Sequence, residues 1–267
     1  MKLRLFNIAI SLFFVISPLK EIVNKIQPAY NNNYQGLSTK ELDWYYETQK
    51  NGEVPLPPKE SRSFISKYNG YYVGDTSKKE IYLTFDEGYE NGYTSKILDI
   101  LKKHNIKAAF FVVKPYIKTN VELIKRMEEE GHLVCNHSSH HPSMAAITDK
   151  NKFQAEFTEV EGIYNEVTGK EMPKFFRPPM GKYSELSMKL TSDLGYRTIF
   201  WSFAYKDWIP ESQPHKEYAL NKILSRTHNG AIILLHAVSK TNAEILEELI
   251  SAWKDRGYEI KSLNELP

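Results

Sequence analysis

The chain has one cysteine, Cys135, among 267 residues. A single thiol cannot form an intramolecular disulfide, and it excludes a zinc site built from several thiolates. Any metal must therefore be held by histidine and carboxylate side chains. Net charge is also small, because 35 lysines and arginines stand against 33 aspartates and glutamates. A net charge of +2 does not indicate the basic surface stripe that binds the phosphate backbone of a nucleic acid, so we expect no nucleic-acid partner.

The sequence has no internal repeat and no glycine-rich phosphate loop. Gly88 and Gly92 lack both the glycine spacing and the following acidic residue of a dinucleotide-binding motif. With 41% hydrophobic and 13% aromatic residues, the composition is that of an ordinary globular chain. We expect one large domain with a short preamble, since α/β barrels of roughly 200 to 250 residues form one domain.

A long apolar run occurs only near the N-terminus. Lys2 and Arg4 precede the apolar segment 5–19, and charge returns at Lys20. A basic start followed by ~7 to 15 apolar residues is typical of a secretory signal and is short for a ~20-residue spanning helix. Residues 1–26 are thus predicted to be a signal peptide or a signal anchor, with a buried core helix as the alternative. We expect an exported protein, secreted or membrane-anchored on the outer side of the cytoplasmic membrane.

Residues 27–74 are polar and tyrosine-rich, which predicts a linker and N-terminal extension. Ser38 to Glu41 resembles a capping box, so we expect a short helix there that ends at the PLPP segment 55–58. The aromatic residues 44–46 are expected to pack the extension onto the main body rather than to bind ligand.

Beyond Lys79, short apolar runs alternate with amphipathic segments. The apolar runs predict buried strands at 81–85, 108–113, 132–136, 197–201, 231–236 and 258–263. The amphipathic segments predict helices at 94–104, 120–131, 184–195 and 242–257, three of which end in glycine. This alternation predicts a parallel sheet covered by helices, either a barrel or a doubly wound sheet.

Ionisable residues follow or end four of these apolar runs, and Arg177 follows a further short run, the two phenylalanines at 175–176. The ionisable residues are Asp86 and Glu87, His137 and His141, Arg177, Asp207 beside Trp208, and His236. In a parallel α/β sheet the active site lies at the carboxyl ends of the strands, so we expect these groups on one face. The alternative for Asp86 and Glu87 is a turn or helix cap.

His137 and His141 predict a metal site, because a spacing of four residues brings both imidazoles within reach of one cation. Pro142 disfavours helical geometry at His141, so we expect a strand end that runs into a tight turn. His140 is expected to point elsewhere. Zinc needs a third ligand, for which Glu87 or a water is the candidate. A solvated histidine-rich loop is the alternative.

Two further pairs are predicted. The prolines after Arg177 give it a rigid base from which its guanidinium can hold Asp86 ionised and lower the pKa of that carboxyl. A plain structural corner is the alternative. Asp207 can bond one ring nitrogen of His236, which fixes the tautomer and raises the imidazole pKa toward a general-acid role. The alternative for His236 is a core histidine bonded to a backbone carbonyl.

Together these segments resemble the polysaccharide deacetylase family, which carries the NodB homology domain and is also called carbohydrate esterase family 4. Five motifs occur in the family's order: TFDE at 84–87, HSSHHP at 137–142, RPPMG at 177–181, DW at 207–208 and LLH at 234–236. The resemblance covers residues 75–265 and implies an α/β fold, a distorted (β/α) barrel. Longer stretches resemble the subgroup that de-N-acetylates muramic acid on the way to muramic δ-lactam in spore cortex.

The resemblance implies a role for each motif. Asp86 is the catalytic base, oriented by Arg177, and His236 is the general acid, tuned by Asp207. Trp208 and Leu234 wall the acetyl pocket beside Met180, and these three residues are expected to contact substrate.

The metal implied by the family is a divalent ion on His137 and His141, with zinc expected first and cobalt, manganese or magnesium as alternatives. Two positions depart from the family's pattern. Glu87 replaces the aspartate that ligates the metal, and Ala204 replaces the leading aspartate of the fourth motif.

The implied activity is removal of the N-acetyl group from peptidoglycan muramic acid, with an amidase as the enzyme that removes the stem peptide first. N-acetylglucosamine in peptidoglycan or a chitin-like polymer is the alternative substrate. A non-catalytic glycan-binding barrel is the alternative from another class. We expect a monomer that works in the cell wall or spore cortex.

Overall fold

The structure is a computed structural model that describes residues 34–49 and 52–267. The predicted signal or anchor at 1–26 lies outside the described residues. Residues 38–267 form one compact unit, which contains all the elements described below. Within the described part of the chain, no helix is both long enough and apolar enough to cross a membrane.

Ten strands are described. They are β1 Leu42–Asp43, β2 Gly70–Tyr71, β3 Glu80–Glu87, β4 Ala109–Val112, β5 Leu133–Asn136, β6 Phe175–Phe176, β7 Lys182–Tyr183, β8 Arg197–Ile199, β9 Ala231–His236 and β10 Glu259–Lys261. The α-helices are α2 Thr94–Lys103, α3 Lys114–Thr119, α4 Val121–Glu129, α5 Lys150–Thr168, α6 Glu185–Asp193, α7 Lys216–Arg226 and α8 Lys240–Asp255.

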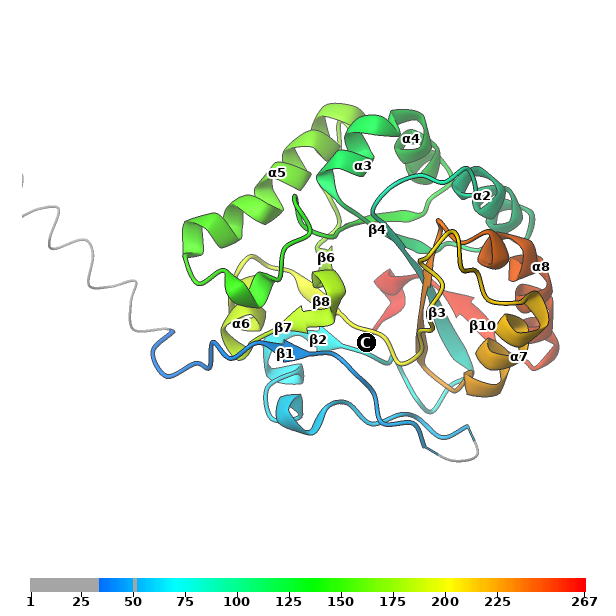
Figure 1. Ribbon diagram of the computed structural model, residues 1–267, viewed down its shortest axis with the longest axis horizontal. Helices are drawn as coiled ribbons and strands as arrows, with labels where there is room; N and C mark the ends of the chain where they lie inside the picture. The colour runs from blue at the N-terminus through cyan, green and yellow to red at the C-terminus, as the bar shows by residue number, and fades with distance from the viewer. Residues whose placement is uncertain (1–33, 50–51) are drawn as a thin grey trace, which may run out of the picture. The chain divides into compact units, whose positions relative to one another are not determined.

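Eight of the strands form one curled sheet in which every pairing is parallel (Figure 1). β3 is its axis: β9 pairs along one edge of β3, while β10 and β4 share the other edge. The order continues through β5, β6 and β8 to β2. An isolated bridge between Phe203 and Ile233 then joins the segment after β8 to β9, so the ends of the sheet meet. The predicted distorted barrel is confirmed.

Side chains of β3 alternate between the helices and the barrel interior, as strand geometry requires. Ile81, Leu83 and Phe85 belong to the large core between sheet and helices. Tyr82 belongs to the smaller cluster inside the barrel. This alternation determines the face to which the next two side chains of the strand point. Asp86 points to the barrel interior, and Glu87 points to the helices.

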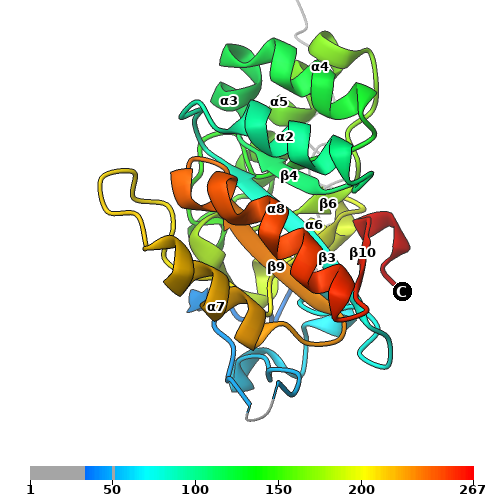
Figure 2. The same ribbon diagram turned by 90° about the vertical axis from the view of Figure 1, so that its right-hand side faces the viewer.

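The helices cover the outer face of the sheet through apolar stripes. Figure 2 shows α2, α7 and α8 in front of β3 and β9. Leu98 of α2 and Leu249 and Trp253 of α8 are fully buried in the core beneath them. Burial of each such side chain contributes roughly 1.5 to 3 kcal/mol, so the helices hold the sheet in its curled form.

The strands and the four helices predicted from sequence are present within a few residues of their expected ends. Gly131, Gly195 and Gly257 have φ of +78°, +81° and +78°, as expected just past a helix. Three helices were not predicted: α3, α5 and α7. α5 was missed because its 19 residues bury only four side chains, so its apolar stripe is sparse.

The helix expected after Ser38 is wrong. Leu42 and Asp43 instead form β1, which pairs antiparallel with Tyr183 and Lys182 of β7. The adjoining backbone continues the pairing, since the Trp44 amide donates to the Gly181 carbonyl at 2.8 Å. Hydrogen bonds to a distant strand outweigh a local capping signal here.

The N-terminal extension packs on the barrel, as expected for its aromatic residues. Trp44 stacks on Phe200 with ring centroids 4.1 Å apart, and its indole N–H donates to the Trp201 carbonyl at 2.9 Å. The extension also supplies β2, which pairs with β8. The sheet therefore begins before residue 75, where the motifs alone placed the start of the domain.

Candidate active site

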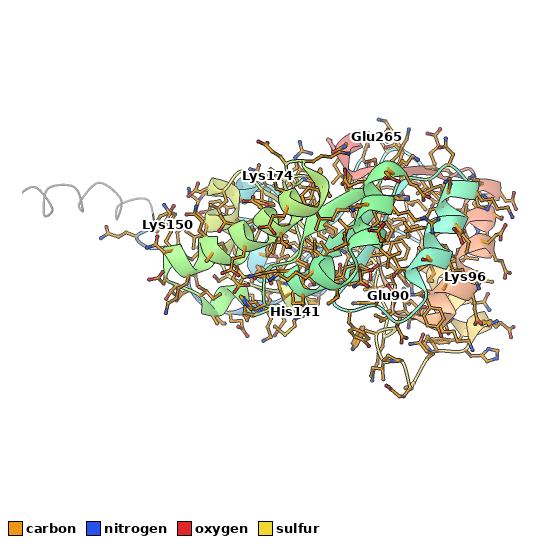
Figure 3. All side chains as sticks on the ribbon, turned by 90° about the horizontal axis from the view of Figure 1, so that it is seen from above. Glu90, Lys96, His141, Lys150, Lys174 and Glu265 are labelled. Carbon is orange, nitrogen blue, oxygen red and sulfur yellow. The ribbon has the colours of Figure 1, made fainter. Side chains whose placement is uncertain are left out.

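A cleft of about 740 Å³ opens at the carboxyl ends of the strands. Asp86, His137, His141 and His236 all line it. Figure 3 shows His141, which follows β5, on the side of the barrel away from Lys174, which precedes β6. The structure thus brings together the carboxylate and the three imidazoles that were predicted to share one face.

Asp86 is held by a buried guanidinium. Arg177 is fully buried, and its Nη1 donates to Asp86 Oδ1 at 2.7 Å. Its Nη2 donates to Thr84 Oγ1 at 2.8 Å and its Nε to the Ile199 carbonyl at 3.0 Å. Burial alone would raise the pKa of Asp86, but the positive charge of Arg177, aided by His137 and His236, holds the pKa below its ordinary value. Asp86 is therefore an ionised carboxylate at neutral pH.

His137 is buried with a defined tautomer. Its Nδ1 donates to the Arg177 carbonyl at 2.8 Å, which leaves the lone pair on Nε2, 3.6 Å from Asp86 Oδ2. Burial lowers the pKa of His137 to about 4. The ring is therefore neutral at neutral pH and able to donate an electron pair.

His141 lies beside His137, with ring centroids 4.9 Å apart. It has a φ of +57°, and its backbone N–H donates to Ser138 Oγ at 3.0 Å, so the chain makes the expected tight turn rather than a helix. Partial burial lowers the pKa of His141. His140 points elsewhere, as expected: it is exposed and its Nδ1 lies 2.8 Å from Glu156 Oε1.

His236 is paired with a buried carboxylate. Asp207 accepts from His236 Nδ1 at 2.7 Å through one oxygen and from the His236 amide at 2.9 Å through the other. Asn242 Nδ2 donates to Asp207 at 2.6 Å. Burial opposes the charged imidazolium, but the carboxylates of Asp207 and then Asp86 outweigh it and raise the pKa of His236.

The candidate ligand Glu87 does not face the cleft. Its carboxylate is fully buried on the helix side of β3, where Thr94 Oγ1 donates to Oε1 at 3.5 Å. Burial, with the nearby charges of Glu90 and Asp86, raises the pKa of Glu87 well above its ordinary value. The interpretation of Glu87 as a metal ligand is therefore corrected, because successive strand residues point to opposite faces and Asp86 occupies the cleft side.

The candidate metal ligands in the cleft are thus the two imidazoles of His137 and His141. Both are neutral, and the hydrogen bond from His137 to a backbone carbonyl orients its free nitrogen as in metal-ligating histidines. They fit a divalent ion as a pair of ligands. Within residues 34–49 and 52–267, no group of three or more histidine, cysteine or acidic side chains is arranged to hold an ion. Completion of the coordination shell would therefore fall to water or substrate.

The walls of the cleft are apolar and aromatic. Trp208 stands at its rim with its ring centroid 5.4 Å from that of His236, Leu234 lies buried beneath, and Met180 is 54% exposed. All three residues predicted to contact substrate line the cleft. Met180 and Gly181 both have positive φ, and a side chain on Gly181 would meet Trp201 at 2.9 Å and Trp44 at 3.1 Å.

Several contributors were not singled out from sequence. Trp44, Tyr45 and Tyr46 of the extension line the cleft, although they were expected only to pack. Thr84 and Asn242 support Arg177 and Asp207 from behind. Thr84 lies two residues before Asp86, so strand alternation was the signal that places it on the same face. Asn242 gave no signal, since its position depends on how α8 packs.

The chain is similar to known proteins over most of its length. A family model described as polysaccharide deacetylase matches residues 73–199. An uncharacterised 30.6 kDa protein of Geobacillus stearothermophilus is 48% identical over 86% of this chain and 86% of its own. The Bacillus subtilis peptidoglycan-N-acetylmuramic acid deacetylase PdaA is 43% identical over 87% of this chain and 88% of its own. The solved structure of PdaA, a family 4 carbohydrate esterase, matches with a TM-score of 0.83 at 43% identity and covers 86% of this chain and 98% of that chain.

Proposed function

Because the chain belongs to the polysaccharide deacetylase family, carbohydrate esterase family 4, we propose that it removes the N-acetyl group from muramic acid in peptidoglycan. The choice of muramic acid is supported by the 43% identity to a Bacillus subtilis protein named for that reaction, with most of both chains aligned. The observation that carries the proposal is the pairing of an ionised Asp86 with a protonatable His236 in one cleft.

Asp86 acts as the general base. Its carboxylate stays ionised next to Arg177 and therefore takes a proton from a water in the cleft. The resulting hydroxide attacks the carbonyl carbon of the acetamide. The oxyanion that forms accepts a hydrogen bond from the main-chain N–H at Met180, on the wall of the cleft.

His236 acts as the general acid. Asp207 holds the proton on Nδ1, so Nε2 is the nitrogen that meets the substrate. Its raised pKa keeps the imidazolium populated near neutral pH. Transfer of that proton to the amide nitrogen lets the carbon–nitrogen bond break, which leaves acetate and a free amino sugar.

We propose that His137 and His141 would hold a divalent ion, and that this ion is zinc. When bound, such an ion supplies Lewis acidity to the acetamide carbonyl and increases the acidity of water in the cleft. The two imidazoles remain neutral without it, because burial lowers their pKa values.

The rim supports a sugar polymer as the substrate. Of the six large hydrophobic side chains that are exposed in the described residues, four line the cleft. These are Tyr45, Tyr89, Met180 and Trp208. The three aromatic rings among them can pack against the apolar face of a sugar ring, and exposed apolar side chains gathered at one site are typical of a ligand-binding groove.

The site of action proposed is the cell wall outside the cytoplasmic membrane, reached through the N-terminal signal or anchor. The free amine released at muramic acid is the group that muramic δ-lactam formation consumes. We therefore propose that the protein works on the route to this lactam in spore cortex, after an amidase has removed the stem peptide.

The test is acetate release from purified peptidoglycan glycan strands by the region from residue 38 onward, with and without prior amidase treatment. Mass spectrometry of fragments locates the lost acetyl group on muramic acid or on glucosamine. The expected result is loss from muramic acid, restored by zinc after chelation. Loss from glucosamine alone would replace the substrate, and binding without release would support a non-catalytic barrel.

A further inference from the structure

Lys206 is the only lysine or arginine among the described residues that line the cleft. Its side chain is exposed, and no hydrogen bond or ion pair joins it to any residue in the described ranges. The other charged groups at the floor are already satisfied, since Asp86 is bonded to Arg177. Among the described residues, Lys206 is therefore a cation without a partner at the mouth of a cleft that also holds the Asp86 carboxylate, the His236 imidazole and several aromatic rings.

We propose that Lys206 binds the lactyl carboxylate of muramic acid and so selects glycan strands whose stem peptide has been removed. The inference rests on the proposed function, because it assumes that the acetamide of an amino sugar enters this cleft. The inference adds to the proposed function the residue that distinguishes muramic acid from other amino sugars.

The covalent structure of muramic acid explains why a cation is needed at this position. The acetamide is attached to C2 of the ring and the lactyl ether to the neighbouring C3, so the two groups enter the cleft together. Lys206 is the residue before Asp207, which anchors the general acid His236. Its flexible four-carbon stem starts beside the catalytic pair and ends in a strongly hydrated point charge.

Charge balance makes the preference selective. A lactyl carboxylate that approached the ionised Asp86 without a counter-ion would be repelled. An attached stem peptide converts this carboxylate into an uncharged amide, and glucosamine carries a hydroxyl at the same carbon. Of these three sugars, only peptide-free muramic acid has a negative charge on the lactyl group at C3, and a charge-assisted hydrogen bond is about twice as strong as a neutral one.

The experiment measures binding and turnover separately. Wild type, Lys206→Gln and Lys206→Glu are compared on peptide-free muramic acid glycan fragments and on the same fragments with the lactyl carboxylate converted to its methylamide. Lys118→Glu is the matched control, because Lys118 is an exposed lysine of α3 that does not line the cleft. Dissociation constants come from calorimetry and KM and kcat from acetate release.

For the carboxylate fragments, we expect Lys206→Gln to raise the dissociation constant and KM about tenfold and Lys206→Glu to raise them further, with kcat little changed. The methylamide fragments should bind all variants equally, and Lys118→Glu should match wild type. Equal weakening for both fragments, or no weakening for either, would overturn the role of Lys206. Failure of the proposed function has a different signature: no acetate release from any fragment, whatever the binding data show.

Discussion

Asp86 and His236 are direct partners in the β3–β9 ladder, one on each of two adjacent parallel strands. Both side chains open into the same cleft. Neighbouring strands lie about 4.8 Å apart, so the hydrogen bonds of the sheet set the separation of the two backbones that carry the proposed base and the proposed acid. Loops supply the groups that orient them, Arg177 and Asp207, but not the pair itself.

Replacement of Asp86 by asparagine should reduce kcat on the order of a thousandfold, because an amide cannot accept the proton from water. The side chain keeps its size, so Arg177 can still donate to its oxygen and the fold should persist. Acetate release measures the effect, and circular dichroism checks folding. More than a few per cent of wild-type activity in a folded variant would rule out Asp86 as the base.

The pH profile should report His236. As the proposed general acid it must be protonated, and its pKa is raised above 6.5, so kcat/KM should fall as pH rises through that raised pKa. Asp207→Asn removes the carboxylate that raises the pKa, and the alkaline limb should then move to lower pH. An unchanged limb in this variant would assign the limb to another group.

Arg177→Met should lower the free energy of unfolding by about 3 to 5 kcal/mol, because it leaves the carboxylate of Asp86 buried without a counter-ion. The double variant that also carries Asp86→Asn removes both charges and should recover part of the loss. Urea denaturation of both variants measures this. A double variant that is no more stable than the single one would show that packing of Arg177 on Phe111, not its charge, dominates.

Glu87→Gln tests whether Glu87 contributes to metal binding. Glu87 faces the helices, so acetate release and zinc affinity should stay at wild-type levels. The pKa of Glu87 is raised, which means that its stabilising contribution is present at low pH and is lost as pH rises through the folded value. Glutamine should therefore gain stability relative to wild type as the pH rises above the ordinary pKa of a glutamate, which urea denaturation at several pH values measures. A large loss of zinc affinity would restore Glu87 as a ligand.

Much of the barrel was predictable because buried parallel strands leave a clear mark in sequence. The run 231–236, for example, is apolar up to residue 235 and ends in His236, which predicts both the strand and the end at which its functional residue lies. The same pattern places Asp86, His137 and His236 on one face from the sequence alone. α5 left no such mark, since most of its surface is solvated.

The orientation of Glu87 shows that a sequence motif does not by itself specify the face of the strand to which each side chain points. A motif specifies neighbours along the chain, whereas a strand sends consecutive residues to opposite faces, so one of two adjacent acids had to turn away from the cleft. Alternation could have predicted this outcome once the strand was known to continue through residue 87. The aromatic wall from the extension was beyond such reasoning, because β1 and Trp44 are fixed by pairing with residues more than a hundred positions later.

The stacking of Trp44 on Phe200 has a practical consequence for anyone who truncates this chain. A fragment cut at residue 75, where the resemblance to the family begins, would keep the proposed base, the proposed general acid and both candidate metal ligands. Such a fragment would nevertheless expose the rings of Phe200 and Tyr183 to water, and it would lack the wall of the cleft that residues 44–46 form. Residues from Ser38 onward belong to the same compact unit as the barrel, so a fragment that keeps the whole lining of the cleft must start before Trp44.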